Sequence, residues 1–173
     1  MSGPVISLEL PRDAMVLLVG PSGSGKSTFA LSHFRPTEVL SSDEMRAMVA
    51  DDPNDQTATQ AAFELLHTAL EMRLLRGRLT VVDATNLEAW SRAQLLAIAR
   101  RHRRPAAAIV LDLPLAECLA RNAARSDRRP ATSVRRQHRL LGAAVAATAS
   151  EGYARSWILR SQLEVAAVRV TRQ

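Results

Sequence analysis

One nine-residue run constrains this chain more than any other feature. Residues 20–28 have the sequence G-P-S-G-S-G-K-S-T, which fits the pattern G-x-x-x-x-G-K-[ST]. The apolar residues 15–19 precede the run, and Phe29, Ala30 and Leu31 follow it. A buried strand that leads into a helix N-terminus aims backbone N–H groups at an anion. The run therefore predicts a P-loop, which holds the phosphates of a nucleotide, although a Gly/Ser-rich turn is the alternative.

Lys26, inside this run, is the only lysine of the chain. All other residues of the lysine and arginine class are arginines. An ammonium is a compact point charge, whereas a guanidinium is a planar fork that suits a different pocket. We therefore predict that Lys26 contacts the β- and γ-phosphates and is essential for catalysis, and that the hydroxyl of Ser27 faces Mg²⁺. The other loop residues expected to bind the nucleotide are Ser22, Gly23, Ser24, Gly25 and Thr28.

The length of 173 residues predicts one domain, residues 1–173. A formal charge of +6 indicates an acidic partner, either a nucleotide or a nucleic acid. The single cysteine, Cys118, excludes an internal disulfide and fits a reducing compartment, and its apolar neighbours predict a packed thiol. No run is long and apolar enough to span a membrane, and the N-terminus lacks a signal-peptide pattern, so we expect a cytoplasmic protein without a membrane partner.

Strand-like and helix-like segments alternate along the chain. Strands are expected at residues 5–10, 15–19, 38–41, 79–82, 106–113 and 165–170, and a short strand or a 3₁₀ turn at 157–159. Helices are expected after the P-loop to about residue 33, around 63–76, and at 88–103, 114–124 and 132–150. This alternation predicts an α/β three-layer sandwich, with a mainly parallel central sheet and helices on both faces. Right-handed crossovers bring the P-loop, residues 42–43 and residues 83–86 to one edge of that sheet, where open α/β sheets bind ligands.

Two carboxylates at this edge are candidates for the chemistry. Asp83 ends an apolar strand, as a Walker B carboxylate does, and is expected to hold Mg²⁺ directly or through water, unless it only caps the next helix. Asp43 follows the strand at 38–41 and could take a proton from an attacking hydroxyl. Arg46 lies three residues later, on the same helical face, and could bind an acceptor phosphate. The alternative for this pair is a helix cap with a local ion pair.

Arginines cluster after the strand at 106–113. Arg121 and Arg125 are four residues apart on one helix side, and could stabilise charge on a transferring phosphate. Arg128, Arg129, Arg135 and Arg136 extend the positive surface, with roles that the sequence leaves open. A solvated charge run is the alternative for all of them. A second basic group, residues 100–104, lies at a helix C-terminus, where the helix dipole alone can account for it.

Five elements, in order, resemble the 5′-OH polynucleotide kinase domain of bacterial polynucleotide kinase-phosphatases. They are the P-loop, S-S-D-E-M-R at 41–46, D-D-P-N-D-Q at 51–56, V-V-D-A-T-N at 81–86 and R-N-A-A-R at 121–125. The resemblance runs from residue 15 to about 140. It implies an adenylate-kinase-like P-loop NTPase fold with a short arginine-rich lid, at about 121–139. It also implies Mg²⁺-dependent transfer of the γ-phosphate of ATP or another NTP to the 5′-OH end of RNA or DNA.

The resemblance implies roles for particular residues. Asp43 would be the general base, Arg46 a contact to the acceptor end, and Arg121 and Arg125 clamps on the donor phosphates. Further acceptor contacts would come from Gln56, Thr85 and Asn86.

The chain departs from the family in two respects. The lid sequence S-D-R-R-P at 126–130 is shorter than the family pattern. The phosphatase and ligase-type modules that follow the kinase in that family are not in this sequence, so we expect either a freestanding kinase or the N-terminal module of a longer repair protein. A small-metabolite or antibiotic kinase is the alternative function, and a nucleotide-gated binding module without phosphotransfer is the second. The choice between RNA and DNA, the preferred NTP base and the oligomeric state stay open.

Overall fold

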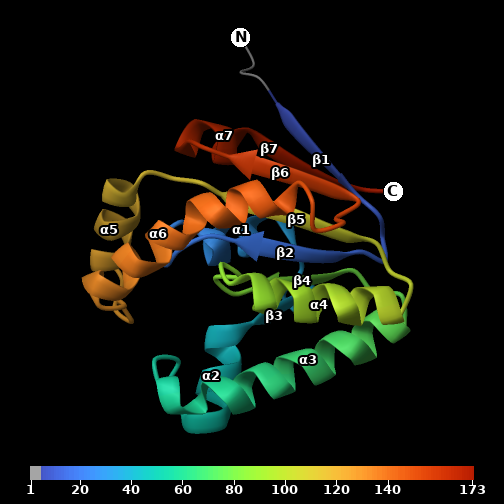
Figure 1. Cartoon of the computed structure of the whole chain (residues 1–173), viewed down its shortest axis with the longest axis horizontal. Helices are drawn as coiled ribbons and strands as arrows, with labels where there is room; N and C mark the ends of the chain where they lie inside the picture. Colours follow the sequence, from blue (N-terminus) through green and yellow to red (C-terminus); the bar gives the residue numbers. More distant parts are fainter. Residues whose placement is uncertain (1–4) are drawn as a thin grey trace.

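A five-stranded parallel sheet forms the centre of the computed structural model, which describes residues 5–173 (Figure 1). The strand order is β3-β4-β2-β5-β6. Every residue of the three central strands is buried, as expected for a parallel sheet that is covered on both faces and made of continuous apolar runs. The strands are β2 (Met15–Val19), β3 (Val39–Ser41), β4 (Thr80–Asp83), β5 (Ala106–Leu111) and β6 (Arg155–Leu159).

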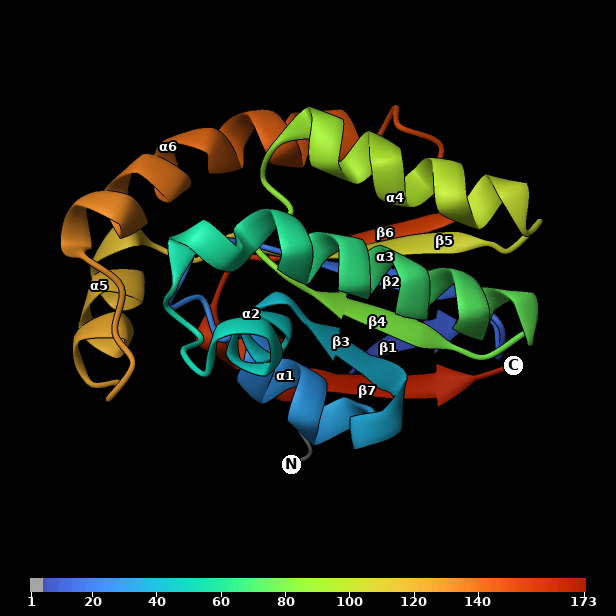
Figure 2. The same ribbon diagram turned by 90° about the horizontal axis from the view of Figure 1, so that it is seen from below.

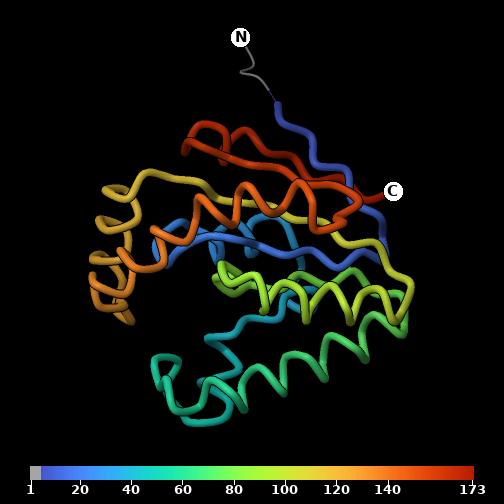
Figure 3. Tube along the Cα trace, in the orientation of Figure 1, coloured from blue at the N-terminus to red at the C-terminus, as the bar shows by residue number. Residues whose placement is uncertain are grey.

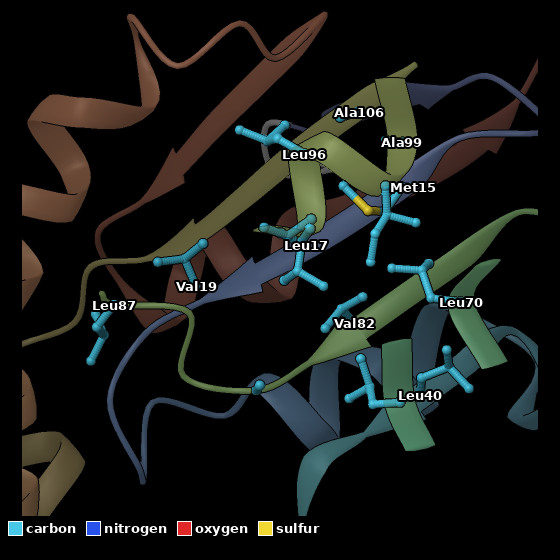
Figure 4. Close-up of a cluster of buried hydrophobic side chains, with 14 of the residues drawn as sticks. Met15, Leu17, Val19, Leu40, Leu70, Val82, Leu87, Leu96, Ala99 and Ala106 are labelled. Carbon is cyan, nitrogen blue, oxygen red and sulfur yellow. The ribbon is translucent and has the colours of Figure 1, made fainter. Parts of the chain in front are cut away.

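Three long helices cover one face of the sheet: α3 (Thr59–Leu75), α4 (Ala89–Arg101) and α6 (Ala131–Thr148) (Figure 2). Leu66, Leu70 and Leu74 recur every fourth residue of α3 and are fully buried. They belong to one apolar cluster with side chains from the sheet and from α4, part of which Figure 4 shows. The helix stripe expected from the sequence is thus confirmed.

The opposite face is covered by α1 (Lys26–His33) and by a two-stranded parallel ribbon of β1 (Ile6–Leu10) and β7 (Val168–Arg172). Leu8 and Leu10 of β1 are fully buried in a second apolar cluster, together with Phe29 of α1. The α/β three-layer sandwich with a mainly parallel sheet is therefore confirmed. The outer ribbon is an addition that the alternation of strands and helices did not predict.

The expected strand at 165–170 is wrong in its first half. Residues 165–167 end a short helix, α7 (Gln162–Ala167), and β7 begins only at Val168. The hydroxyl of Ser161 accepts a hydrogen bond from the backbone N–H of Glu164 at 3.2 Å, which caps that helix. A serine followed three residues later by a glutamate is a helix-start signature, and it outweighs the β propensity of Val165.

The lid region beyond the carboxyl ends of the central strands consists of α5 (Leu115–Ala123) and the first part of α6 (Figure 3). They pack on each other through Leu113, Cys118 and Val134. Cys118 is fully buried, and burial raises the pKa of its thiol. This agrees with the packed, unreactive thiol that its neighbours predicted.

Three further helical elements lie between α1 and α3 along the chain. They are α2 (Ser42–Ala50) and two 3₁₀ turns, η1 (Pro36–Glu38) and η2 (Gln56–Ala58). No helix within residues 5–173 combines the length and the apolar character needed to cross a bilayer.

Candidate active site

The three polar loops that follow strands β2, β3 and β4 meet around one cavity of about 1230 Å³. The cavity lies at the carboxyl edge of the sheet, the place expected for a ligand in an open α/β fold. Its other walls come from α3, α4 and the lid. The candidate residues that line it include Ser22, Lys26, Ser27, Asp43, Arg46, Gln56, Asp83, Thr85, Asn86 and Arg125.

The P-loop backbone adopts a shape that requires glycine at two positions. Gly23 has a φ of 81°, and a β-carbon there would overlap the carbonyl group of Cys118. Gly25 is the N-cap of α1 with a φ of 95°, and a β-carbon there would lie 2.7 Å from Nη1 of Arg121. The loop therefore packs directly against α5, and its path to the helix N-terminus depends on both glycines.

Lys26 is only 8% exposed, and its Nζ donates to the carbonyl oxygen of Pro21 at 2.9 Å. Burial lowers the pKa of this ammonium, and the negative charges of Asp83 and Asp43 oppose that shift. A compact cation is thus held in a nearly dry pocket, where its attraction to an anion is stronger than at the protein surface.

Ser27 and Asp83 form a hydrogen-bonded pair next to the P-loop. The Ser27 hydroxyl donates to Oδ2 of Asp83 at 2.7 Å, and Asp83 is 6% exposed. Burial raises the pKa of this carboxyl, opposed by the charge of Lys26 and by the Ser27 hydrogen bond. Within residues 5–173, no group of three or more histidine, cysteine or acidic side chains could hold a metal ion. The two oxygen ligands fit Mg²⁺, which is bound through few protein carboxylates, several waters and substrate phosphates.

Asp43 lies in the first turn of α2, but it is not the residue that caps this helix. The cap is Ser41, whose hydroxyl accepts from the backbone N–H of Glu44. Oδ1 of Asp43 instead accepts from Arg46 at 2.8 Å and from Arg129 at 2.7 Å. The carboxylate is therefore paired with one arginine of its own helix and one arginine of the lid.

Arg46 is 8% exposed, and its Nε donates to the hydroxyl of Thr59 at 3.2 Å. Burial lowers the pKa of its guanidinium, while Asp43 opposes the shift. The side chain thereby joins α2 to the first residue of α3, which fixes both the arginine and the carboxylate beside it.

Arg121 of α5 and Arg125, two residues beyond the end of that helix, have different surroundings. Arg125 lines the cavity and makes a bidentate pair with Asp127, at 3.0 and 2.8 Å, which raises the pKa of Arg125 and lowers that of Asp127. Arg121 lies behind the P-loop, where its Nη2 donates to Gln162 at 2.8 Å. The structure therefore brings one of the two predicted clamps into the cavity and places the other against the outer side of the loop.

Asn86 is 2% exposed, and its Nδ2 donates to the carbonyl oxygen of Leu18 at 2.8 Å. The amide thus ties the loop after β4 to β2. Its N–H donor points into the fold and not toward the place where a phosphoryl-acceptor substrate would bind. Gln56 and Thr85, in contrast, are at least partly exposed on the cavity wall. We retain these two as candidate acceptor contacts and assign Asn86 to positioning the loop.

The second basic group, at residues 100–104, makes contacts away from the cavity. Arg104 pairs with Asp13 at 2.7 Å, Arg101 pairs with Glu71, and Arg100 donates to the carbonyl oxygen of Glu151. These arginines tie the end of α4 to neighbouring elements, so this group has structural partners in addition to the helix dipole.

A family model described as an AAA domain matches residues 15–148 of the chain. The chain belongs to this AAA domain family. No curated protein matches it.

Solved structures share the fold of this AAA domain at low sequence identity. A chain of the Pnkp1/Rnl/Hen1 RNA repair complex is 22% identical, with a TM-score of 0.67 over 80% of this chain and 46% of that chain. The Mycobacterium tuberculosis APS kinase CysC, solved with AMPPNP and APS, is 20% identical, with a TM-score of 0.56 over 91% of this chain and 94% of its own. A gluconokinase from Sinorhizobium meliloti 1021 is 18% identical, with a TM-score of 0.55 over 90% and 87%.

These likenesses establish a kinase-like P-loop fold for the AAA domain. The chain spans less than half of the repair-complex chain that it matches, but most of the two metabolite kinases.

Sequence reasoning left the role of Arg129 open, and the structure places this residue in the lining of the AAA domain's cavity. Its Nη2 bridges Asp43 and the carbonyl oxygen of Pro53, at 2.7 and 3.1 Å. Asn122 holds the backbone of Arg129 through two hydrogen bonds, of 2.8 and 3.0 Å. Asn122, in the run R-N-A-A-R, is the sequence feature that could have pointed to Arg129, because its buried side-chain amide holds the backbone seven residues later.

Two further residues escaped the sequence analysis. Gln137 of α6 accepts a hydrogen bond from the backbone N–H of Ser22 at 2.8 Å, so the lid helix contacts the P-loop directly. Arg92 of α4 is 1% exposed, pairs with Glu151 and donates to the carbonyl oxygens of Asn86 and Leu87. Both residues position loops of the site, and no local sequence pattern marked either one.

Proposed function

We propose that this domain transfers the γ-phosphate of an NTP to the 5′-OH end of RNA or DNA, with Mg²⁺ and ATP or another NTP as donor. One observation carries the proposal: Asp43, paired with Arg46 and Arg129, lines the same cavity as the P-loop and the Ser27–Asp83 pair. A phosphate cradle, a metal site, a candidate base and arginines are the parts that phosphoryl transfer requires.

On the donor side, the ammonium of Lys26 and the N–H groups at the start of α1 would bind the β- and γ-phosphates. Arg125 would turn from Asp127 toward the transferring group and neutralise its charge. When bound at Ser27 and Asp83, Mg²⁺ would supply further positive charge to the phosphate oxygens.

On the acceptor side, Asp43 would take the proton of the 5′-OH as its oxygen forms a bond to the γ-phosphorus. The bond between that phosphorus and the bridging β,γ-oxygen breaks, and the NDP leaves. Arg46 and Arg129 would bind the first phosphate of the acceptor strand, which holds the hydroxyl near Asp43. Gln56 and Thr85 would complete the contact on the cavity wall.

Two observations support a polynucleotide over a small acceptor. The chain carries a formal charge of +6, and arginines from α2 and the lid converge on one carboxylate of the cavity. The fold is also similar to a chain of an RNA repair complex with a TM-score of 0.67. If the domain is one module of a longer repair protein, phosphatase or ligase modules would be its partners in the same chain.

A small-metabolite kinase is the second candidate. The observation that favours it is the match to APS kinase and to gluconokinase over most of their lengths and most of this chain. A nucleotide-gated binding module is a third, and it gives no role to a base at the position of Asp43.

One incubation separates these candidates. The domain is mixed with γ-labelled ATP, Mg²⁺ and, in parallel, 5′-OH RNA and DNA oligonucleotides, nucleosides, sugars and adenylyl sulfate. Label on the oligonucleotides alone supports the proposal, and label on a sugar or nucleotide metabolite alone contradicts it. Release of labelled phosphate without any labelled acceptor would favour the nucleotide-gated module.

A further inference from the structure

We propose that Trp90 is a stacking platform for the first nucleobase of the acceptor strand, an inference that rests on the proposed function and adds a base subsite to it. The indole lines the active-site cavity from the start of α4, yet Trp90 is 65% exposed. A large aromatic surface left in water beside a ligand cavity forgoes the stabilisation that burial would give, and such surfaces mark binding sites.

The placement of Trp90 contrasts with that of most other aromatic side chains. The chain has three phenylalanines, two tryptophans and one tyrosine. Phe29 and Phe34 are buried in the core, while Trp157 and Tyr153 pack against core clusters. Phe63 and Trp90 are the two that line the cavity. The few aromatic side chains thus lie either in or against the core or in the lining of this cavity.

Phe63 and His67 of α3 contribute further flat rings to the same cavity. Their ring centroids lie 6.1 Å apart in an edge-on arrangement. Burial lowers the pKa of His67, which favours the neutral imidazole at physiological pH. The starts of α3 and α4 lie at the lid end of the molecule, on the same side of the sheet (Figure 2). Together, the two helices give this part of the cavity uncharged aromatic rings on which a base can stack.

The cavity separates its arginines from its aromatic surface in the way that a nucleotide requires. Within residues 5–173, its arginines come from α2 and the lid region, whereas α3 and α4 contribute no arginine to its lining. A nucleic-acid end has phosphates that attract guanidinium groups and bases that stack on aromatic rings. A sugar acid would use the arginines but has no base to stack on the indole.

The test uses two variants of Trp90 and two acceptors. The acceptors are the same 5′-OH oligonucleotide with its first base present and with that base removed. Because one base stacked on an aromatic ring is worth about 1–3 kcal/mol, Trp90→Ala should raise the KM for the intact oligonucleotide by about 5- to 150-fold. Trp90→Phe should recover most of that loss. For the abasic oligonucleotide, both variants should equal the parent.

A binding measurement checks stacking without turnover. In a Trp157→Phe background, Trp90 is the remaining tryptophan, and the intact oligonucleotide should quench its fluorescence more than the abasic one does. Leu75→Ala, at an exposed apolar residue of α3 outside the cavity lining, serves as the control and should leave KM unchanged.

The outcomes separate the inference from the function on which it rests. Phosphorylation of the oligonucleotide with the same KM in the parent and in Trp90→Ala, or an equal loss on both acceptors, overturns the stacking platform alone. Failure of the parent to phosphorylate any oligonucleotide overturns the proposed function, and this subsite with it.

Discussion

In the donor half of the cavity, Lys26 and Asp83 are 8% and 6% exposed, whereas in the acceptor half the side chain of Asp43 is 35% exposed. The donor half comes from two neighbouring strands and one helix, which the sheet holds in place. The acceptor half is assembled from α2, α3, α4 and the lid, elements distant in the sequence. We infer that the donor half is the rigid and general part of the site, and that the acceptor half determines specificity.

The largest effect should come from Asp43→Asn, because the amide cannot accept the acceptor proton. Loss of a general base costs about 10²- to 10⁴-fold in rate. The affinity for ATP should hardly change, since Asp43 belongs to the acceptor half. Single-turnover rates and ATP-induced shifts in melting temperature measure the two properties. Glu44→Gln, at the exposed neighbour, is the matched control; a lost ATP shift with normal turnover of the bound complex would assign Asp43 to the donor half.

Lys26→Arg should lower the rate by about 10²- to 10³-fold, the scale for loss of one group that stabilises transition-state charge. The pocket around Nζ is nearly closed, and a planar guanidinium cannot take the place of the ammonium. In this case the ATP-induced shift in melting temperature should also shrink. Near-normal phosphoryl transfer by this variant would show that the site around Lys26 also accepts a guanidinium, despite the burial of this residue.

Arg125→Ala should cost about 100-fold in rate, and Arg121→Ala clearly less, because only Arg125 of the two lines the cavity. The comparison is made at saturating ATP and acceptor, with melting temperatures to verify folding. Arg103→Ala, in the basic group at the end of α4, should behave like the parent. Equal losses of rate from all three substitutions would show that the lid arginines act only as general positive surface charge.

Arg129→Ala should raise the acceptor KM by about 10-fold, the value of a hydrogen bond to a charged group. Arg128→Ala, one residue earlier and exposed, should change KM less, since no protein partner fixes its position among the hydrogen bonds of residues 5–173. Steady-state kinetics with a 5′-OH oligonucleotide over a range of salt concentrations measures both. If the two variants weaken binding equally, the pairing of Arg129 with Asp43 does not matter for the acceptor.

The smallest effect concerns the lid pair Arg125–Asp127. Because the pKa of Asp127 is lowered in the folded state, its contribution to stability is present above about pH 4 and is lost as the pH falls through the lowered value. Both side chains are more than one-third exposed, so the parent should exceed Asp127→Ala by only about 1 °C in melting temperature at pH 7. The difference should close in acid. A gap that persists at low pH would mean that Asp127 stabilises the lid by other contacts.

The two halves also differ in how far the sequence predicted them. The P-loop, the buried strand before it and Asp83 are local patterns, and each lies where the sequence placed it. Asp43 and Arg46 were found for the same reason, since they are neighbours on one helix turn. The sequence thus predicted the fold class and the meeting of the three polar loops.

The contacts of the lid with the two halves could not be predicted, because they join residues far apart in the chain. Arg129 reaches Asp43 across 86 positions, and Gln137 reaches Ser22 across 115. The packing of α5 and α6 decides whether an arginine or an amide near the lid faces solvent or the site. Helical periodicity in the sequence does not predict that packing. Arg121 and Arg125 show the same limit, since their spacing suggested a shared position, but only Arg125 lines the cavity.

The ribbon of β1 and β7 has a consequence for how the chain folds during translation. β1 is synthesised before the strands of the central sheet, but Ile6 pairs with Val168, so its partner strand is synthesised after them. The central sheet uses shorter connections and can form earlier, because contacts distant in sequence carry the larger entropic cost of loop closure. Until residues 168–172 emerge, Leu8 and Leu10 lack the backbone partners that hold them on the sheet. Between the synthesis of β1 and that of β7, the nascent domain thus has an unpaired strand with two apolar side chains, and such strands are where chaperones bind and aggregation begins.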